Sequence, residues 1–303
     1  MPGAPPPVAA QARALEAGCV GAAGAGRSIA CARVADAAAL VIGRVGLAAA
    51  GGNPAPGTAS TLGHRTPGTP RLALAGRFTF VPVEMPAIRG TSTGVATFVA
   101  TAWSVEGVIG VTQGFAILPT AGGFGAIDLF GGGGVVHLPI GEGFRGRKPG
   151  TWTLGARLGI LRESFTAPGV TLSGQYRRIG QWNFGDVRLV TGESFVRAET
   201  ASMWSTRAVI GKRVAPVALT VGAGRDYVDA TVVMRVRSGT VPVEARVDAF
   251  RDTRNVLFAN AAWTFVVLTF SAEAGWQSGL DDAGAGAPGG GALWGSLAAR
   301  LTF

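Results

Sequence analysis

Residues 293–303, LWGSLAARLTF, alternate between two kinds of side chain up to the terminal phenylalanine. Successive side chains of a β-strand point to opposite faces, so the two kinds of residue would lie on opposite faces of one strand. The first face carries Leu293, Gly295, Leu297, Ala299, Leu301 and Phe303, and the second carries Trp294, Ser296, Ala298, Arg300 and Thr302. An apolar face opposite a small or polar face is typical of a strand that spans a membrane within a β-barrel.

Four other segments repeat this alternation: 71–82, 151–161, 228–238 and 266–277. We expect the apolar face of each to contact lipid and the opposite face to line the barrel lumen. In 228–238 the predicted lipid face consists of Val228, Ala230, Val232, Met234 and Val236. The repetition predicts a closed antiparallel transmembrane β-barrel, an all-β fold.

The composition favours a barrel over a soluble β-sandwich, which would also alternate. Only 15% of the residues are charged, and the chain has 48 glycines. A sandwich would expose many Lys, Glu and Thr side chains, but only Lys148 and Lys212 are lysines. The net charge of +9 comes from arginines spread singly along the chain, which argues against a nucleic-acid-binding stripe.

About twelve to fourteen strand-like segments follow residue 70. Single-chain bacterial barrels have even strand numbers, so we predict fourteen strands, with twelve as the next choice. Residues 255–272 are interpreted as parts of two adjacent strands, with a buried helix as the alternative. The predicted organisation is a hatch or plug over 13–60 and a barrel over 61–303.

The N-terminal region suggests export. Residues 1–12 end in Ala10-Gln11-Ala12, the form of a signal-peptidase site, and we interpret them as the remnant of a signal peptide. Cys19 and Cys31 form either a short disulfide loop, as in an oxidising periplasm, or two buried thiols.

An Ala- and Gly-rich N-terminal stretch leads into Asn53, Pro54 and Ala55, and the chain ends on Phe303. In these features the sequence resembles the FadL-type hydrophobic-compound channels of the outer membrane. The resemblance implies a hatch that plugs a fourteen-stranded barrel. The chain departs from that family in its short length, in Pro56-Gly57 after the motif and in its two cysteines. It is also similar to outer-membrane barrel proteins of GC-rich bacteria.

Charged residues on the predicted lumen face are candidates for ligand binding. One or two arginines would bind the carboxylate of an amphipathic ligand through the fork of the guanidinium group. The alternative is that they only solvate the lumen and pair with acidic residues. The candidates are Arg77, Arg157, Arg235, Arg237, Glu273 and Arg300.

Two short motifs resemble enzyme signatures. Residues 141–146 match GxGxxG but lead into a turn rather than a helix. Residues 90–94 match GxSxG around Ser92, with Asp128 and His137 following, but the next residues look like a strand rather than the helix of a nucleophile elbow. We therefore predict no enzyme, no cofactor and no metal site.

The sequence predicts a protein of the bacterial outer membrane that acts as a passive channel for small hydrophobic or amphipathic compounds. The alternatives are a structural or assembly protein with a sealed lumen and a barrel-embedded lipid hydrolase. The expected partners are outer-membrane lipid, the small ligand and the barrel-assembly machinery, with Leu301 and Phe303 as the C-terminal assembly signal. No nucleic acid is expected.

Overall fold

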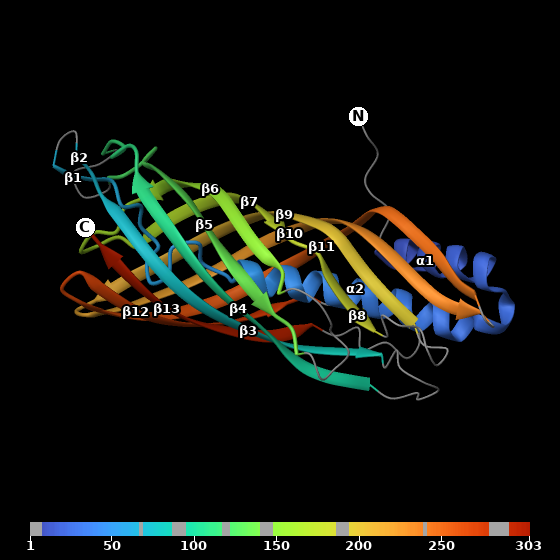
Figure 1. The fold of residues 1–303 in the computed structure, drawn as a ribbon. Coiled ribbons are helices and arrows are strands. Elements are labelled where there is room, and N and C mark those ends of the chain that lie inside the picture. Colours follow the sequence, from blue (N-terminus) through green and yellow to red (C-terminus); the bar gives the residue numbers. More distant parts are fainter. Residues whose placement is uncertain are drawn as a thin grey trace.

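The strands of the chain follow two N-terminal helices (Figure 1). A computed structural model describes residues 8–66, 69–86, 95–116, 122–139, 148–185, 194–238, 241–278 and 291–303. The helical elements are α1 (Val8–Ala23), a 3-10 turn η1 (Ala25–Arg27) and α2 (Ser28–Ala50). The strands are β1 (His64–Thr66), β2 (Thr69–Pro70), β3 (Leu72–Pro86), β4 (Val95–Gly110), β5 (Ile127–His137), β6 (Gly150–Leu161), β7 (Gly169–Ile179), β8 (Trp182–Gly185), β9 (Ser194–Val214), β10 (Val217–Ser238), β11 (Val241–Phe265), β12 (Leu268–Gln277) and β13 (Ala292–Thr302).

Ten of these strands form a closed antiparallel barrel. Their order is β3, β4, β5, β6, β7, β9, β10, β11, β12 and β13, and the ring closes because β13 pairs with β3. β8 continues the line of β7 along β9, since Ile179 pairs with Ala201 and Trp182 pairs with Ala198. β1 and β2 pair with each other apart from the ring.

The predicted strand number of fourteen, or twelve, is therefore wrong. The strands are longer than the roughly 9–11 residues that cross a bilayer. β9, β10 and β11 have 21, 22 and 25 residues, so the same length of chain makes fewer strands. Residues 255–272 do divide into two adjacent strands as predicted, because β11 ends at Phe265 and β12 begins at Leu268.

The outer surface of the barrel changes character along the long strands. Near the end that carries the C-terminus, the outward side chains of β10 are apolar and exposed, as with Leu219 and Val221. Farther along β10 the outward face includes charged side chains, beginning with Arg225, whose Nε donates to Asn255 Oδ1 at 3.0 Å. Asp229 follows and pairs with Arg251 at 3.2 Å. A band that contacts lipid therefore covers the half of the barrel nearest the C-terminus, and β9–β11 extend beyond it.

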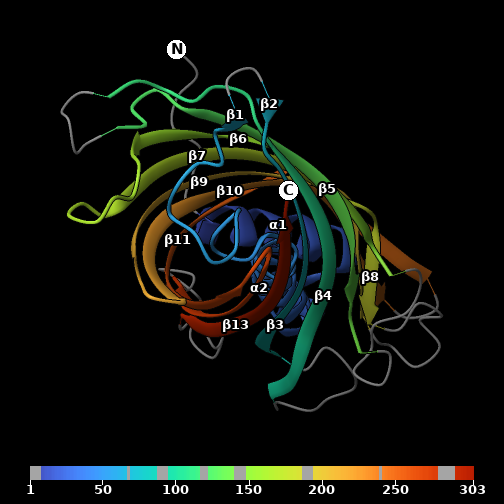
Figure 2. The same cartoon turned by 90° about the vertical axis from the view of Figure 1, so that its left-hand side faces the viewer.

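The helices lie inside the ring and its extension (Figure 2). α1 packs on β10 and β11 where these strands extend beyond the apolar band (Figure 1), and Cys19 and Cys31 form a disulfide that joins α1 to α2. Nearly all of α2 from Val34 to Ala50 is buried. Within the described ranges, no helix is both long enough and apolar enough to cross a membrane by itself.

The helices reverse the predicted faces of residues 228–238. Val228, Ala230, Val232, Met234 and Val236 point inward and are at most 3% exposed. They belong to the same buried apolar cluster as Val41, Val45 and other residues of α2. Consequently Arg235 and Arg237 lie on the outer face, and their predicted place in the lumen is wrong. An apolar wall is required here because α1 and α2, not water, fill the barrel at this level.

In the other four segments the burial follows the predicted alternation. Leu74, Leu154, Phe270 and Leu297 are exposed on the outside. Their lumen-side neighbours are buried, and these include Arg77, Arg157, Glu273 and Arg300.

Candidate functional site

The lumen is occupied by a segment that we call the plug, residues 39–62, which comprises the second half of α2 and the irregular chain after it. Figure 2 looks down the barrel and shows this part of the chain inside the ring of strands. Most of the contacts described next join the plug to the inner face of the wall, and the others lie within the plug or within the wall.

Arginines of the wall cap the end of α2. Arg77 Nη1 donates to the carbonyl of Ala50 at 3.0 Å, and its Nη2 donates to the carbonyl of Asn53. Arg207 donates to the carbonyl of Gly51 at 3.4 Å. The last carbonyls of a helix lack partners within the helix and carry partial negative charge, so two guanidinium groups satisfy both needs.

Glu273 of β12 holds the two residues that follow. Its carboxylate accepts the backbone N–H of Gly52 at 3.0 Å and that of Asn53 at 2.9 Å, and also the hydroxyl of Ser296 at 3.3 Å. A side chain on Gly52 would collide with the wall, because its Cβ would lie 2.8 Å from Phe258 and 2.9 Å from the Glu273 carboxyl carbon. Glycine is therefore required for the plug to approach this carboxylate.

The predicted hatch motif makes a turn. The Asn53 side chain accepts the N–H of Ala55 at 3.1 Å and donates to the carbonyl of Thr58 at 3.0 Å. Pro54 lies between Asn53 and Ala55, inside the turn that the first of these hydrogen bonds closes. The motif thus shapes the plug after α2, because the Asn53 side chain accepts a hydrogen bond from the backbone N–H two residues further on.

A buried ion pair holds the other end of the plug. Arg157 and Asp128 lie 2.5 Å apart and are almost fully buried. Asp128 also accepts the N–H of Leu62 at 3.0 Å, and Arg157 donates to the carbonyl of Ser60 at 3.3 Å. Each member of the pair therefore also holds one residue of the plug.

Toward α1, two more arginines bind helix α2 to the wall. Arg44 of the helix donates to Gln277 of β12 at 3.0 Å. Arg254 of β11 donates to the carbonyl of Ala39 at 3.3 Å and pairs with Asp252 at 2.5 Å. The plug is thus hydrogen-bonded to the wall from Ala39 to Leu62, and its contacts are distributed over six strands of the ring: β3, β5, β6, β9, β11 and β12.

Beyond the plug the barrel opens at its C-terminal end into a cavity of about 1110 Å³, which we call the vestibule. Its inner end is formed by Thr58, Ser60, Thr61 and Leu62 of the plug. Arg71, Arg162, Arg213 and Arg300 line it, together with one acidic residue, Glu163. The vestibule is therefore polar, basic and closed at its inner end by the plug.

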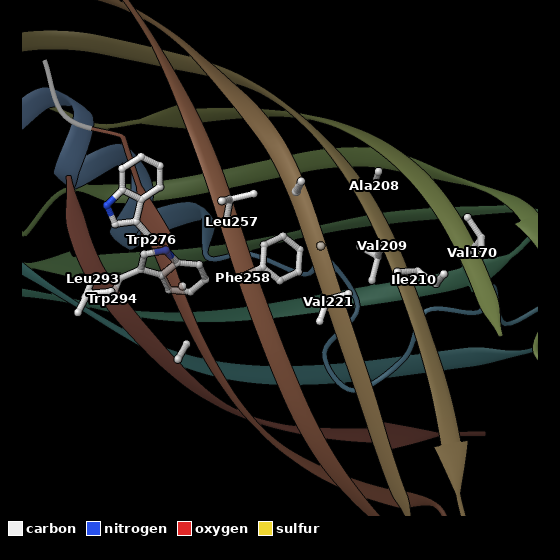
Figure 3. A pocket seen from close by; sticks show the side chains of 14 residues that line it. Val170, Ala208, Val209, Ile210, Val221, Leu257, Phe258, Trp276, Leu293 and Trp294 are labelled. Carbon is white, nitrogen blue, oxygen red and sulfur yellow. The ribbon is translucent and has the colours of Figure 1, made fainter. Parts of the chain in front are cut away.

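A second hollow, of about 860 Å³, lies on the outer face (Figure 3). Figure 3 shows its side chains spread across the strands from Val170 on β7 to Leu293 on β13. Ile210, Val221 and Leu257 are exposed there, and no described charged residue lines it. We assign this groove to the surface that contacts lipid hydrocarbon.

The structure divides the predicted ligand-binding residues into three groups. Arg77, Arg157 and Glu273 contact the plug, and Arg300 lines the vestibule. Arg235 and Arg237 lie outside. The sequence analysis did not assign Arg207, Asp128 or Arg254 to the lumen wall, because their strands mix charged and apolar residues on the inner face and show no clean alternation.

The enzyme-like motifs lie mostly in parts of the chain that the structure does not describe. Residues 90–94 with Ser92, and residues 141–146, lie outside the described residues. His137 ends β5 and is half-buried. No group of three or more potential metal ligands occurs among the described side chains.

No family model matches the chain, and no curated protein sequence matches it. Solved structures with a similar fold include the translocator domain of the autotransporter NalP from Neisseria meningitidis, at 11% identity and a TM-score of 0.38, covering 78% of this chain and 89% of that one. The outer membrane protease OmpT from Escherichia coli has 11% identity and a TM-score of 0.38, with coverage of 81% and 100%. An outer membrane channel from Pseudomonas putida F1 has 9% identity and a TM-score of 0.38, with coverage of 83% and 100%.

These likenesses concern the fold alone. They leave the FadL-type resemblance, and the expectation that the chain is not an enzyme, as predictions. A closed barrel has no open strand edge, and an apolar outer band suits it to lipid. The described strands of the chain thus form a closed β-barrel with an apolar outer band, as a barrel that spans a membrane requires.

Proposed function

We propose that this protein is a barrel sealed by its own N-terminal segment, which holds the α1–α2 hairpin at the cell surface. The proposal selects the sealed-lumen alternative over an open passive channel. The observation that carries it is the series of hydrogen bonds from the wall to the plug, which reaches from Ala39 through residues 50–53 to Leu62.

Removal of the plug would cost free energy, because buried charged groups of the wall would lose their partners. Arg77, Arg157 and Glu273 are each at most 6% exposed, and each is hydrogen-bonded to the plug. A hydrogen bond to a charged group contributes about 1.5–3 kcal/mol, and buried partners left unpaired cost a similar amount. Several such contacts act together, so displacement of the plug without an external ligand or force would be rare.

The short turns between strands indicate which end of the barrel would face the periplasm. Outer-membrane barrels have short turns on the periplasmic side. Two connections at the end where the chain terminates are two-residue turns, Ala215-Pro216 between β9 and β10 and Val266-Val267 between β11 and β12, although residues 111–126 join β4 to β5 at the same end. This end would face the periplasm. The hairpin of α1 and α2 lies at the opposite end and would face the outside.

Conductance measurements test the seal. We expect the full-length protein in planar lipid bilayers to stay closed, and the R77Q/E273Q variant to open in bursts. The matched control is R235Q/E244Q, which removes an exposed outer pair with a separation of 2.7 Å and should stay closed. Steady open conductance of the unchanged protein would contradict the seal.

Epitope insertion tests the orientation. A short epitope between Gly24 and Ala25 should be labelled by antibody on intact cells, and one between Ala215 and Pro216 only after permeabilisation. The reverse pattern would place the hairpin in the periplasm.

A passive channel for small hydrophobic or amphipathic compounds is the second candidate. The vestibule favours it, because this cavity opens at one end of the barrel and leads to the plug. Saturable entry of fatty acids into liposomes that contain the unchanged protein, at a rate that R235Q/E244Q does not alter, would support this candidate over the sealed barrel.

A further inference from the structure

The vestibule contains a buried arginine without a partner. Arg300 of β13 is 5% exposed, and its Nε and Nη1 atoms are buried without a hydrogen-bond partner in the described part of the chain. Its paired neighbours in the sheet are Thr269 on β12 and Ala75 on β3, neither of which carries a charge. A buried guanidinium whose N–H groups have no acceptor is costly, so this position favours an anion.

The acidic residues nearby are already engaged. Asp128 accepts from Arg157 and from the N–H of Leu62. The Glu163 carboxylate accepts the backbone N–H of Arg213. Among the described lining residues, four arginines therefore face one carboxylate, and the vestibule has an excess of positive charge.

The outer part of the vestibule is apolar. Phe165, Val266, Val267 and Phe303 line it, and each of these side chains is about half exposed or more. This apolar rim beside arginines, of which Arg300 is buried, matches a molecule that has an anionic head and a hydrocarbon tail. Guanidinium groups bind the oxygens of carboxylates and phosphates in paired hydrogen bonds.

From the unpartnered Arg300, the surplus of arginines and the apolar rim together, we infer that the vestibule binds the phosphate or carboxylate head of an amphipathic anion. Arg300 contacts the head from the barrel wall, Arg213 contacts it from the end of β9, and the rim receives the start of the tail. This site uses wall residues and does not depend on which face of the membrane carries the hairpin or on whether the lumen ever opens.

Calorimetric titration of the full-length protein in a neutral detergent tests the site. The probes are octyl phosphate, inorganic phosphate and, as the uncharged control, octanol. We expect saturable binding of octyl phosphate and none of octanol. Tighter binding of octyl phosphate than of inorganic phosphate identifies a lipid-like ligand, and equal binding of the two identifies a free anion; both results support an anion site.

Variants assign the contacts. R300Q should weaken octyl phosphate binding about tenfold or more, the equivalent of one lost hydrogen bond to a charged group. R213Q, at an exposed position, should weaken it less and serves as a second variant if R300Q fails to fold. R235Q, on the outer face, should bind as the unchanged protein does.

Three results would overturn the inference. They are the absence of saturable octyl phosphate binding, equal affinity of folded R300Q and R213Q to the unchanged protein, and equal binding of octanol. Each variant is first checked for the compact band that a folded barrel gives on an unheated denaturing gel.

Discussion

Single charged residues on the wall determine how the barrel interior is filled. Arg77 and Arg207 satisfy the carbonyls at the end of α2, and Glu273 satisfies the N–H groups that follow it. The groups have opposite charge because carbonyls need donors and N–H groups need acceptors. The buried arginines of the lumen are thus explained by backbone polarity rather than by a water-filled channel.

Glu273→Gln tests this at one position. A glutamine can accept from Gly52 or Asn53, but its amide nitrogen would face the other N–H, so one buried donor loses its partner. We expect a loss of about 1–3 kcal/mol in the free energy of unfolding, measured by urea titration in lipid vesicles. Glu244→Gln, in the exposed pair with Arg235, should cost about 0–1 kcal/mol. Equal losses in the two variants would contradict the role of Glu273.

At the scale of elements, β10 shows how a helix changes the faces of a strand. Its outward side chains near the C-terminal end of the barrel are apolar because lipid covers them. Farther along, its inward side chains are apolar because α2 covers them, and Val228 lies beside Gly46 of α2. β10 therefore has an apolar outer face where lipid covers it and an apolar inner face where α2 covers it.

Substitutions on the two faces of β10 distinguish these environments. Val228→Asp places an unpaired carboxylate against α2 and should cost about 3–5 kcal/mol, as breaking a buried ion pair does. Asp229→Val, one residue on, removes only an exposed pair with Arg251 and should cost about 0–1 kcal/mol. The unheated compact band, followed over a temperature series, measures both. A milder effect of Val228→Asp than of Asp229→Val would restore the faces predicted from the sequence.

The disulfide belongs to the helical hairpin. Cys19 and Cys31 are separated by 12 residues, and a closed loop of this size contributes about 3 kcal/mol in the loop-entropy account. Cys19→Ser with Cys31→Ser should therefore raise the rate of trypsin cleavage after Arg27 by up to about a hundredfold. The barrel band should remain, because the wall strands carry no part of this loop. An unchanged cleavage rate would show that packing alone holds the hairpin.

At the scale of the whole molecule, ten strands suffice because three neighbouring strands extend far beyond the lipid band. β9, β10 and β11 form a sheet extension that covers α1 and the start of α2. The extension covers one face of α1 beyond the lipid band, while the ten-stranded ring receives the rest of α2 and the plug. The molecule thus combines a membrane barrel with a small α/β layer built from the same strands.

This architecture predicts heat-modifiable mobility. Extracted in detergent, the protein should run faster on a denaturing gel before boiling than after it, since all strands of the ring are paired and the edge is closed. A single band at one mobility, from protein that is soluble without detergent, would contradict the membrane barrel.

Much of the barrel could be predicted from particular stretches of sequence. Residues 293–303 and 151–161 alternate with a period of two, and one face of each is apolar throughout. These residues alone therefore predicted that each segment is a strand and which of its faces points outward. Arg77, Arg157, Glu273 and Arg300 were correctly placed on the inner face for the same reason. Alternation is a local property, because each side chain reports only the medium next to it.

Tertiary structure decided three features: the number of strands, the faces of residues 228–238 and the partners of the charged residues in the lumen. The length of β9–β11 depends on the helices that their extension covers, and the inward Val228 depends on α2, which is nearly two hundred residues away in the chain. Likewise, nothing near Arg77 or Glu273 in sequence indicates that their partners are Ala50 to Asn53. Apolar residues alternate along a strand in the same way whether they face lipid or a helix. Only the folded chain determines which of the two covers them.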